Sequence, residues 1–291
     1  MNDELILHEA TAQQISQFIA NPTHAVLLAG PDGIGKTAIS ESIIAALLDI
    51  PIAKLVHHPY ITRVIPTGNT ISIDAVRELQ RFLQLKTLGT QTYRRAVLIE
   101  HASALTTEAQ NAYLKLLEEP PSDTIMVLTA SSPRTLLPTI RSRLQTITVH
   151  TPDESQLQAL IQARQTNDTA GRQAYFLSGG LPGLITALLA EDQAHPLLTN
   201  VTTAKALLQK QPFERLCMVD ALSKQKETTY GVLEALARIA STGLSGAATK
   251  HDAARIKQWH AIRKATLAAR EALERSTNTK LVLTNLFLNL S

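Results

Sequence analysis

The strongest structural signal in the chain is residues 24–37, which read His24-Ala25-Val26-Leu27-Leu28-Ala29-Gly30-Pro31-Asp32-Gly33-Ile34-Gly35-Lys36-Thr37. The first six residues form a short apolar run that is typical of a buried strand. The last eight fit the pattern G-x-x-x-x-G-K-[ST]. Residues 37–48 then carry apolar side chains at helical spacing. A strand, a phosphate loop and a helix in this order are the setting in which the pattern binds nucleotide.

Each residue type in this loop has a chemical role. Glycines let backbone N–H groups turn toward phosphate oxygens, and the amino end of the following helix attracts anions. Lys36 would reach the β- and γ-phosphates, and the Thr37 hydroxyl would bind Mg²⁺. We therefore expect all eight residues from Gly30 to Thr37 to bind ATP, although such a loop can also bind nucleotide without hydrolysing it.

A second apolar run, residues 96–99, ends in Glu100-His101. In P-loop ATPases an acid at the end of a neighbouring strand holds Mg²⁺, and in many of them the next residue is a Glu that activates water. Glu100 could bind the metal, whereas His101 stands in place of the base. A neutral imidazole can accept a proton, but its nitrogen need not lie where carboxylate oxygens would. We favour a surface histidine, and we expect weak or absent hydrolysis.

The remaining periodicity predicts an α/β domain followed by helices. Further strands are expected at residues 124–128 and 146–149, and further helices at 74–85 and 106–118. Strands that alternate with helices predict a parallel sheet covered on both faces. After residue 150 the strand signal disappears. We therefore expect three domains: an α/β nucleotide-binding domain at 1–150, a small helical domain at 151–195 and an all-helical domain at 196–291.

The composition is that of a globular protein, with 44% hydrophobic and 18% charged residues. The single cysteine, Cys217, excludes an internal disulfide. The sequence shows neither an apolar run approaching 18 residues nor a signal peptide, so we expect a cytoplasmic protein without a membrane span. Residues 196–291 hold 14 basic and 7 acidic side chains. This excess could face nucleic acid or an acidic protein, although a solvated helical surface is the favoured interpretation.

Several longer motifs resemble the DNA polymerase III clamp loader subunits of bacteria, which belong to the AAA+ superfamily. The most specific motif runs from Leu105 to Pro121 and is similar to the family's "LTxxAQNALLKLLEEPP". Residues 73–79 resemble "IDxIREL", residues 95–102 the Walker B strand, and residues 137–145 the region of the "SRC" motif. The resemblance covers about residues 12–190 well. It implies a P-loop AAA+ domain, a small helical lid and a helical collar domain that assembles subunits into a ring.

The resemblance also implies roles for single residues. Arg143 matches the SRC arginine, which in the family reaches the γ-phosphate in a neighbouring subunit's site as a trans arginine finger; the alternative is a structural arginine that pairs with an acid. Leu144 replaces the motif's cysteine at what we expect to be a packing position. Ser131 or Thr129 would be the polar sensor of the γ-phosphate, although a solvated strand end explains both equally well.

Two subunit types of the family differ at positions that this chain can be compared with. The gamma/tau motor normally has Asp-Glu at the end of the Walker B strand and an arginine in the lid. Here the strand ends in Glu100-His101, and Gly179-Gly180-Leu181-Pro182-Gly183 is similar to the "GGxPG" of delta prime. Both features favour a delta-prime-like subunit that binds ATP. The alternatives are the gamma/tau ATPase itself and a scaffold that binds no nucleotide. A different AAA+ function would make the long motif a coincidence.

The resemblance finally implies partners. They are the gamma/tau and delta subunits, the sliding clamp, and primer-template DNA contacted through its phosphates, all within a DNA-directed DNA polymerase holoenzyme. Many relatives carry a four-cysteine zinc module after the first helix, but residues 49–70 contain no cysteine. The adjacent His57 and His58 make a poor metal pair without further ligands. We expect no zinc.

Overall fold

The computed structural model describes residues 5–68, 70–163, 168–190, 196–275 and 278–290. The chain divides into two compact units, Met1–Asp153 and Glu154–Ser291. The further boundary that we expect near residue 195 falls next to residues 191–195, which lie outside the described residues.

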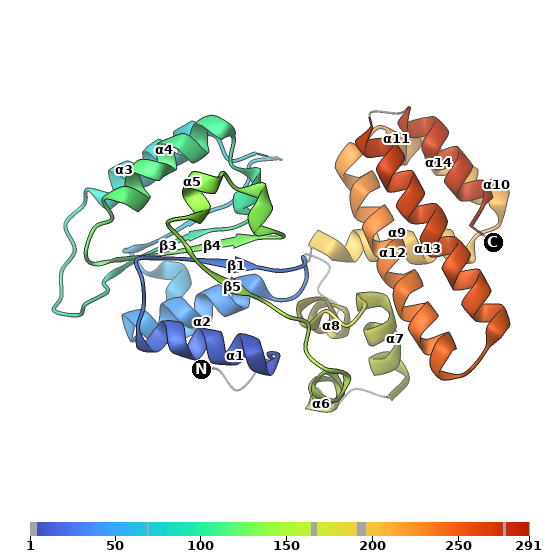
Figure 1. Ribbon diagram of the computed structural model, residues 1–291, viewed down its shortest axis with the longest axis horizontal. Coiled ribbons are helices and arrows are strands. Elements are labelled where there is room, and N and C mark those ends of the chain that lie inside the picture. Colours follow the sequence, from blue (N-terminus) through green and yellow to red (C-terminus); the bar gives the residue numbers. More distant parts are fainter. Residues whose placement is uncertain (1–4, 69, 164–167, 191–195, 276–277, 291) are drawn as a thin grey trace. The chain divides into compact units, whose positions relative to one another are not determined.

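The first unit is built on a parallel sheet of five strands, as the alternating pattern predicts (Figure 1). The strand order is β2-β3-β4-β1-β5, and all four neighbouring pairs are parallel. The strands are β1 (Ala25–Ala29), β2 (Ile61–Val64), β3 (Arg95–Ile99), β4 (Thr124–Ala130) and β5 (Gln145–Thr148). Every residue of β1, β3 and β4 is buried, which explains their continuous apolar runs.

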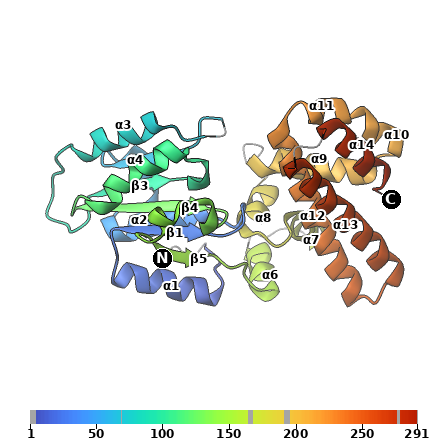
Figure 2. The ribbon, with the colours of Figure 1, turned by 45° about the horizontal axis from the view of Figure 1, so that its top comes forward.

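Helices cover both faces of this sheet (Figures 1 and 2). On one face lie α1 (Glu9–Ala20) and α2 (Lys36–Leu48), and on the other lie α3 (Ile73–Leu83), α4 (Thr107–Glu118) and the short α5 (Pro138–Arg141). The motif at residues 105–121 forms α4. Its N-cap is Thr106, whose hydroxyl accepts a hydrogen bond from the Ala109 N–H at 3.2 Å. Three short 3₁₀ helices, Ile52–His57, Ala102–Ala104 and Pro133–Thr135, complete the connections.

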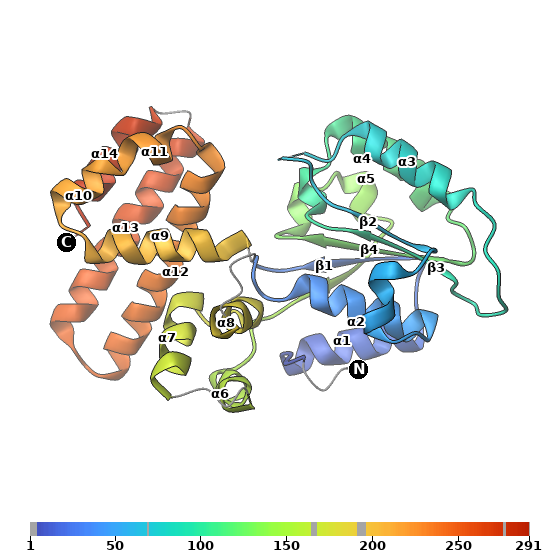
Figure 3. The same ribbon diagram turned by 180° about the vertical axis from the view of Figure 1, so that it is seen from behind.

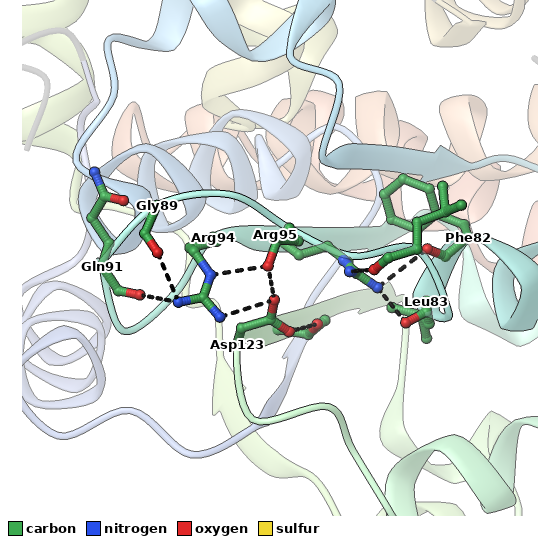
Figure 4. A network of polar contacts seen from close by, with 10 residues as sticks. Phe82, Leu83, Gly89, Gln91, Arg94, Arg95 and Asp123 are labelled. Carbon is green, nitrogen blue, oxygen red and sulfur yellow. Dashed lines mark hydrogen bonds and ion pairs between the residues drawn. The ribbon is translucent and has the colours of Figure 1, made fainter.

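A network of arginines fixes β3 at its amino end (Figure 4). The buried Arg95 guanidinium donates to the carbonyl oxygens of Phe82 and Leu83, in the last turn of α3, and of Leu85, just after it. The backbone N–H groups of Arg94 and Arg95 donate to the Asp123 carbonyl at 2.9 and 3.1 Å. The Arg95 side chain thus satisfies backbone carbonyls at the end of α3, and the bonds to Asp123 join the start of β3 to the start of β4. They also fix the register of β3, whose other end carries Glu100.

The described residues of the second unit form helices and no strand. Its helices are α6 (Glu154–Ala163), α7 (Asp168–Ser178), α8 (Pro182–Leu189), α9 (Pro196–Gln209), α10 (Pro212–Cys217), α11 (Val219–Ser223), α12 (Lys226–Thr249), α13 (Ala253–Glu274) and α14 (Thr279–Leu288). The predicted break at residues 179–183 separates α7 from α8, where Gly179 and Gly180 take φ values of 66° and 78°. Among the described helices, none combines the length and the apolarity that crossing a membrane requires.

The long helices α12 and α13 pack side by side as an antiparallel pair (Figure 3). Gly243 of α12 lets the Trp259 indole of α13 approach, since a Cβ at that position would lie 2.5 Å from the ring. The Trp259 ring also packs edge-on against Phe176 of α7, with ring centroids 5.7 Å apart. The buried Arg215 donates to the carbonyl oxygens of Leu207 and Leu290, which ties the ends of α9 and α14 together.

Candidate functional site

The phosphate loop lies at the carboxyl end of β1, between β4 and β5. Gly30 donates its N–H to the Ala130 carbonyl at 3.1 Å, and a Cβ on Gly30 would lie 2.7 Å from the Val149 carbonyl oxygen. Only glycine therefore fits between the two neighbouring strands. Gly35 has a φ of 98° and directly precedes α2, while the buried Ile34 anchors the loop to the core. The loop is thus shaped by its close strand contacts.

Lys36 is the first residue of α2 and only 6% exposed. Its ammonium group donates to the carbonyl oxygens of Gly30 at 2.7 Å and Pro31 at 3.0 Å, and to Asp32 Oδ1 at 2.9 Å. All three oxygens belong to the loop itself. A buried ammonium requires such partners, and phosphate oxygens would be stronger acceptors of the same kind. Lys36 is therefore held at the loop. A bound phosphate would replace Asp32 as a partner of its ammonium group.

Glu100 directly follows β3 and lies beside the loop. Its Oε2 accepts a hydrogen bond from the Thr37 hydroxyl at 2.6 Å, and its Oε1 accepts one from Arg63 Nε. Burial raises the pKa of Glu100, but the hydrogen bonds from Arg63 and Thr37 outweigh it and hold the pKa below its usual range. The carboxylate is ionised at neutral pH, and both of its oxygens are in use.

The sequence predicts that Mg²⁺ binds at Thr37 and Glu100. The structure brings these two side chains together but places the Arg63 guanidinium on the second carboxylate oxygen. Mg²⁺ needs near-octahedral oxygen ligands at about 2.0–2.1 Å. A cation on Glu100 would lie next to a guanidinium that is always charged. The residues present therefore do not fit a magnesium site in this arrangement.

His101 lies where the ATPase base would be, but its ring is directed at the loop. Its backbone has a φ of 49°, and its N–H donates to Thr129 Oγ1 at 3.1 Å. The imidazole is half exposed, and its Nδ1 lies 4.0 Å from Asp32 Oδ1. The ring is thus placed beside an acid that itself contacts Lys36.

The two candidate sensor residues lie in different surroundings at the end of β4. Thr129 is buried, and its hydroxyl already accepts the His101 N–H. Ser131 follows the last residue of β4 and is exposed. Of the two, Ser131 has the accessible hydroxyl.

Arg143 lies two residues after α5, away from the phosphate loop in sequence, and is partly exposed. Its guanidinium pairs with Glu118 Oε1 at 2.8 Å and donates to the Thr139 carbonyl at 2.9 Å. Glu118 is the last residue of α4, within the long motif. The neighbouring Leu144 is buried in the core cluster on this face of the sheet, in line with the packing role expected for it.

Arg63 is the site residue that the sequence does not reveal. It sits in β2, 37 positions before Glu100, and its Nη1 also lies 3.4 Å from Glu41 Oε1 on α2. No local motif connects these three residues, because their contact arises from the pairing of β2 with β3. A basic residue inside a short strand is the one available signal, and it is weak. His57 and His58, for their part, belong to no cluster of three metal-binding side chains among the residues that the structure describes.

Comparison with known proteins agrees with these motifs. The family model described as "DNA polymerase III, delta subunit" matches residues 7–153, just over half of the chain. The delta' subunit of DNA polymerase III from Pseudomonas aeruginosa is 38% identical over 141 residues, which is 43% of this chain and 42% of the relative. The Escherichia coli delta' subunit is 32% identical over 183 residues, 62% of this chain and 49% of the relative. The matched part thus spans less than half the length of these relatives.

Among solved structures, a DNA polymerase III gamma subunit-related protein from Thermotoga maritima has a similar fold. It superposes with a TM-score of 0.56 at 19% identity, covering 95% of this chain and 97% of the other. At this identity the likeness concerns the fold alone. The family match and the delta' relatives confirm the resemblance found in the motifs: the chain belongs to the DNA polymerase III delta subunit family, and the two relatives described above are delta' subunits.

Proposed function

We propose that this protein is a cytoplasmic clamp loader subunit that binds ATP, hydrolyses it weakly or not at all, and supplies Arg143 to a neighbouring motor subunit. The observation that carries the proposal is the end of β3. There, beside a complete phosphate loop, Glu100 is engaged by Arg63 and is followed by His101 instead of a carboxylate. A loop that can hold phosphates is thus combined with a site that lacks the usual base.

ATP binding would use the loop from Gly30 to Thr37. Lys36 would leave Asp32 and bind phosphate oxygens, while the free N–H groups at the start of α2 would surround the same phosphates. Ser131, exposed after β4, would lie at the sheet edge where parallel strands present ligand-binding residues. Mg²⁺ would take no part in this binding, because Glu100 and Thr37 do not fit a metal site.

The weak or absent hydrolysis follows from the missing base. A general base must reach the attacking water within hydrogen-bond distance. The His101 ring lies beside Asp32, and its position after β3 is held by the bond from its N–H to Thr129. Bound nucleotide would therefore stabilise the first unit without being turned over.

The trans role of Arg143 is supported by the weakness of the ion pair with Glu118 that its side chain would have to break. Its ion pair with Glu118 lies at the surface, with side-chain exposures of 36% and 50%. Such pairs contribute only about 0–1 kcal/mol. An arginine finger stabilises the transition state of phosphoryl transfer by far more than that. Arg143 would thus exchange Glu118 for the γ-phosphate of ATP bound to a gamma/tau neighbour.

The second unit would supply the lid and the collar. Residues 151–195 would form the helical lid, with nucleotide fixing its angle to the α/β domain. Residues 196–291 would form the collar that packs against gamma/tau and delta in an open ring. The assembled ring would open the sliding clamp and close it on primer-template DNA, contacting the DNA through phosphates.

Two other functions remain as competitors. The complete phosphate loop favours the gamma/tau-type motor, in which case the isolated chain would turn over ATP at a motor's rate. The engaged Glu100 favours a scaffold that binds no nucleotide. Measuring both nucleotide binding and ATP turnover by the purified chain separates both from the proposed function: the motor would turn over ATP, and the scaffold would not bind it.

Assembly is the direct test of the subunit role. The purified chain is mixed with gamma/tau and delta from the same bacterium and analysed by size-exclusion chromatography with light scattering. We expect one complex that contains all three chains, because each subunit contributes to a shared ring. Elution of this chain as a separate peak, at concentrations where gamma/tau and delta associate, would contradict the proposed function.

A further inference from the structure

A buried carboxylate paired with an arginine distinguishes this phosphate loop. Arg63 comes from β2, which pairs with β3 so that Val64 lies opposite Ile99. This pairing brings the guanidinium to Glu100, the residue that follows β3. The Arg63 Nη1 also lies 3.4 Å from Glu41 on α2, so the guanidinium is held between two carboxylates. The proposed function gives Arg63 no role in the binding of nucleotide.

The guanidinium binds the acid that P-loop ATPases use to hold a divalent cation. In those enzymes the acid after the neighbouring strand and the hydroxyl of the loop's Ser or Thr face the same ion. Here Glu100 and Thr37 are 2.6 Å apart and face each other, and the charge that neutralises Glu100 comes from Arg63. Glu100 is only 8% exposed, so this charge is needed whether or not a nucleotide is bound.

A metal ion would have to displace this charge. Guanidinium groups stay charged in proteins, and Mg²⁺ sheds its water ligands reluctantly. If Mg²⁺ bound Glu100, the guanidinium would lie unpaired on that side and next to a divalent cation. The loss of this ion pair and the repulsion between the two cations both disfavour binding of Mg²⁺ at Glu100.

We infer that Arg63 takes the place of the divalent cation at Glu100, so that the loop binds nucleotide with little dependence on Mg²⁺. The inference rests on the proposed binding of nucleotide at Gly30–Thr37. It adds the class of ligand: a free adenosine di- or triphosphate, in place of its magnesium complex.

The test measures the affinity of the whole chain for ADP and for the slowly hydrolysed analogue ATPγS by isothermal titration calorimetry. Each titration is run in excess Mg²⁺ and in excess EDTA. For the native chain we expect the two dissociation constants to agree within about threefold, since the cation at Glu100 belongs to the protein. For Arg63→Met we expect binding in EDTA to be weaker than in Mg²⁺ by about tenfold or more, since Glu100 is then free to hold the metal.

Arg77→Met is the matched control. Arg77 lies on the exposed face of α3, pairs with Asp74 at 2.9 Å on the same helix, and carries the same charge. Arg77→Met should bind nucleotide with the same dissociation constants as the native chain, both in Mg²⁺ and in EDTA. Melting temperatures of the three proteins show that each is folded. Electron paramagnetic resonance with Mn²⁺ and ADP gives a second readout: Arg63→Met should bind Mn²⁺ in the complex, and the native chain should not.

Each outcome decides a different claim. If the native chain binds nucleotide more than about tenfold more weakly in EDTA than in Mg²⁺, the inference is wrong. Nucleotide binding at the loop would still hold. Equal, magnesium-independent binding by Arg63→Met overturns the role of Arg63. No binding by the native chain in either medium overturns the inference together with the nucleotide-binding part of the proposed function.

Discussion

Replacing Arg143 by alanine is expected to abolish the DNA-stimulated ATP hydrolysis of a gamma/tau partner while leaving this chain folded. An arginine finger accelerates hydrolysis by about a thousandfold or more. The substitution should cost this chain little folding stability, because the ion pair with Glu118 is a surface contact that contributes about 0–1 kcal/mol. The measurement is the steady-state hydrolysis rate of the reconstituted complex on primed DNA.

The control for Arg143 is Arg134→Ala. Arg134 belongs to the 3₁₀ helix Pro133–Thr135, is exposed, and lies outside the matched SRC position. This variant should keep the native rate. If Arg143→Ala keeps the native rate as well, Arg143 is a structural arginine of its own subunit and the trans role is wrong.

Replacing Lys36 by alanine is expected to weaken nucleotide binding by about tenfold to a hundredfold. A charge-assisted hydrogen bond contributes about 1.5–3 kcal/mol, and each 1.4 kcal/mol corresponds to a factor of ten in affinity. Lys36 is the buried cation of the loop and already binds three of its oxygens. The measurement is the dissociation constant of ATPγS by calorimetry.

Because Lys36 also holds its own loop, a loss of affinity must be separated from a loss of structure. The melting temperature of Lys36→Ala without nucleotide shows whether the domain is folded. Lys54→Ala, which removes an exposed charge from the 3₁₀ helix Ile52–His57, should bind as the native chain does. Unchanged affinity in folded Lys36→Ala would place the nucleotide elsewhere.

The sequence predicts those parts of the fold whose signals are local. The buried runs of β1, β3 and β4 are continuous because both faces of these strands are covered, and the phosphate loop carries its own pattern of glycines. The N-cap at Thr106 and the glycine break before α8 are likewise determined by a few adjacent residues.

What the sequence does not predict depends on contacts between distant residues. β2 has only four residues, of which three are partly buried and Arg63 is exposed, so neither its length nor its alternation indicates a strand. If β2 is not predicted, the contact between Arg63 and Glu100 cannot be predicted either. Glu100 is then expected to be free to bind a metal. The order of the strands likewise arises from pairing across the whole unit and from no single motif.

The most direct measurement compares DNA-stimulated ATP hydrolysis by gamma/tau and delta, with the sliding clamp and primed DNA, in the presence and absence of this chain. If the chain is a clamp loader subunit that completes a neighbour's site, we expect the full rate only when it is present, although by itself it turns over little or no ATP. A rate that is the same without the chain, or turnover by the isolated chain at the rate of the motor, would contradict this account.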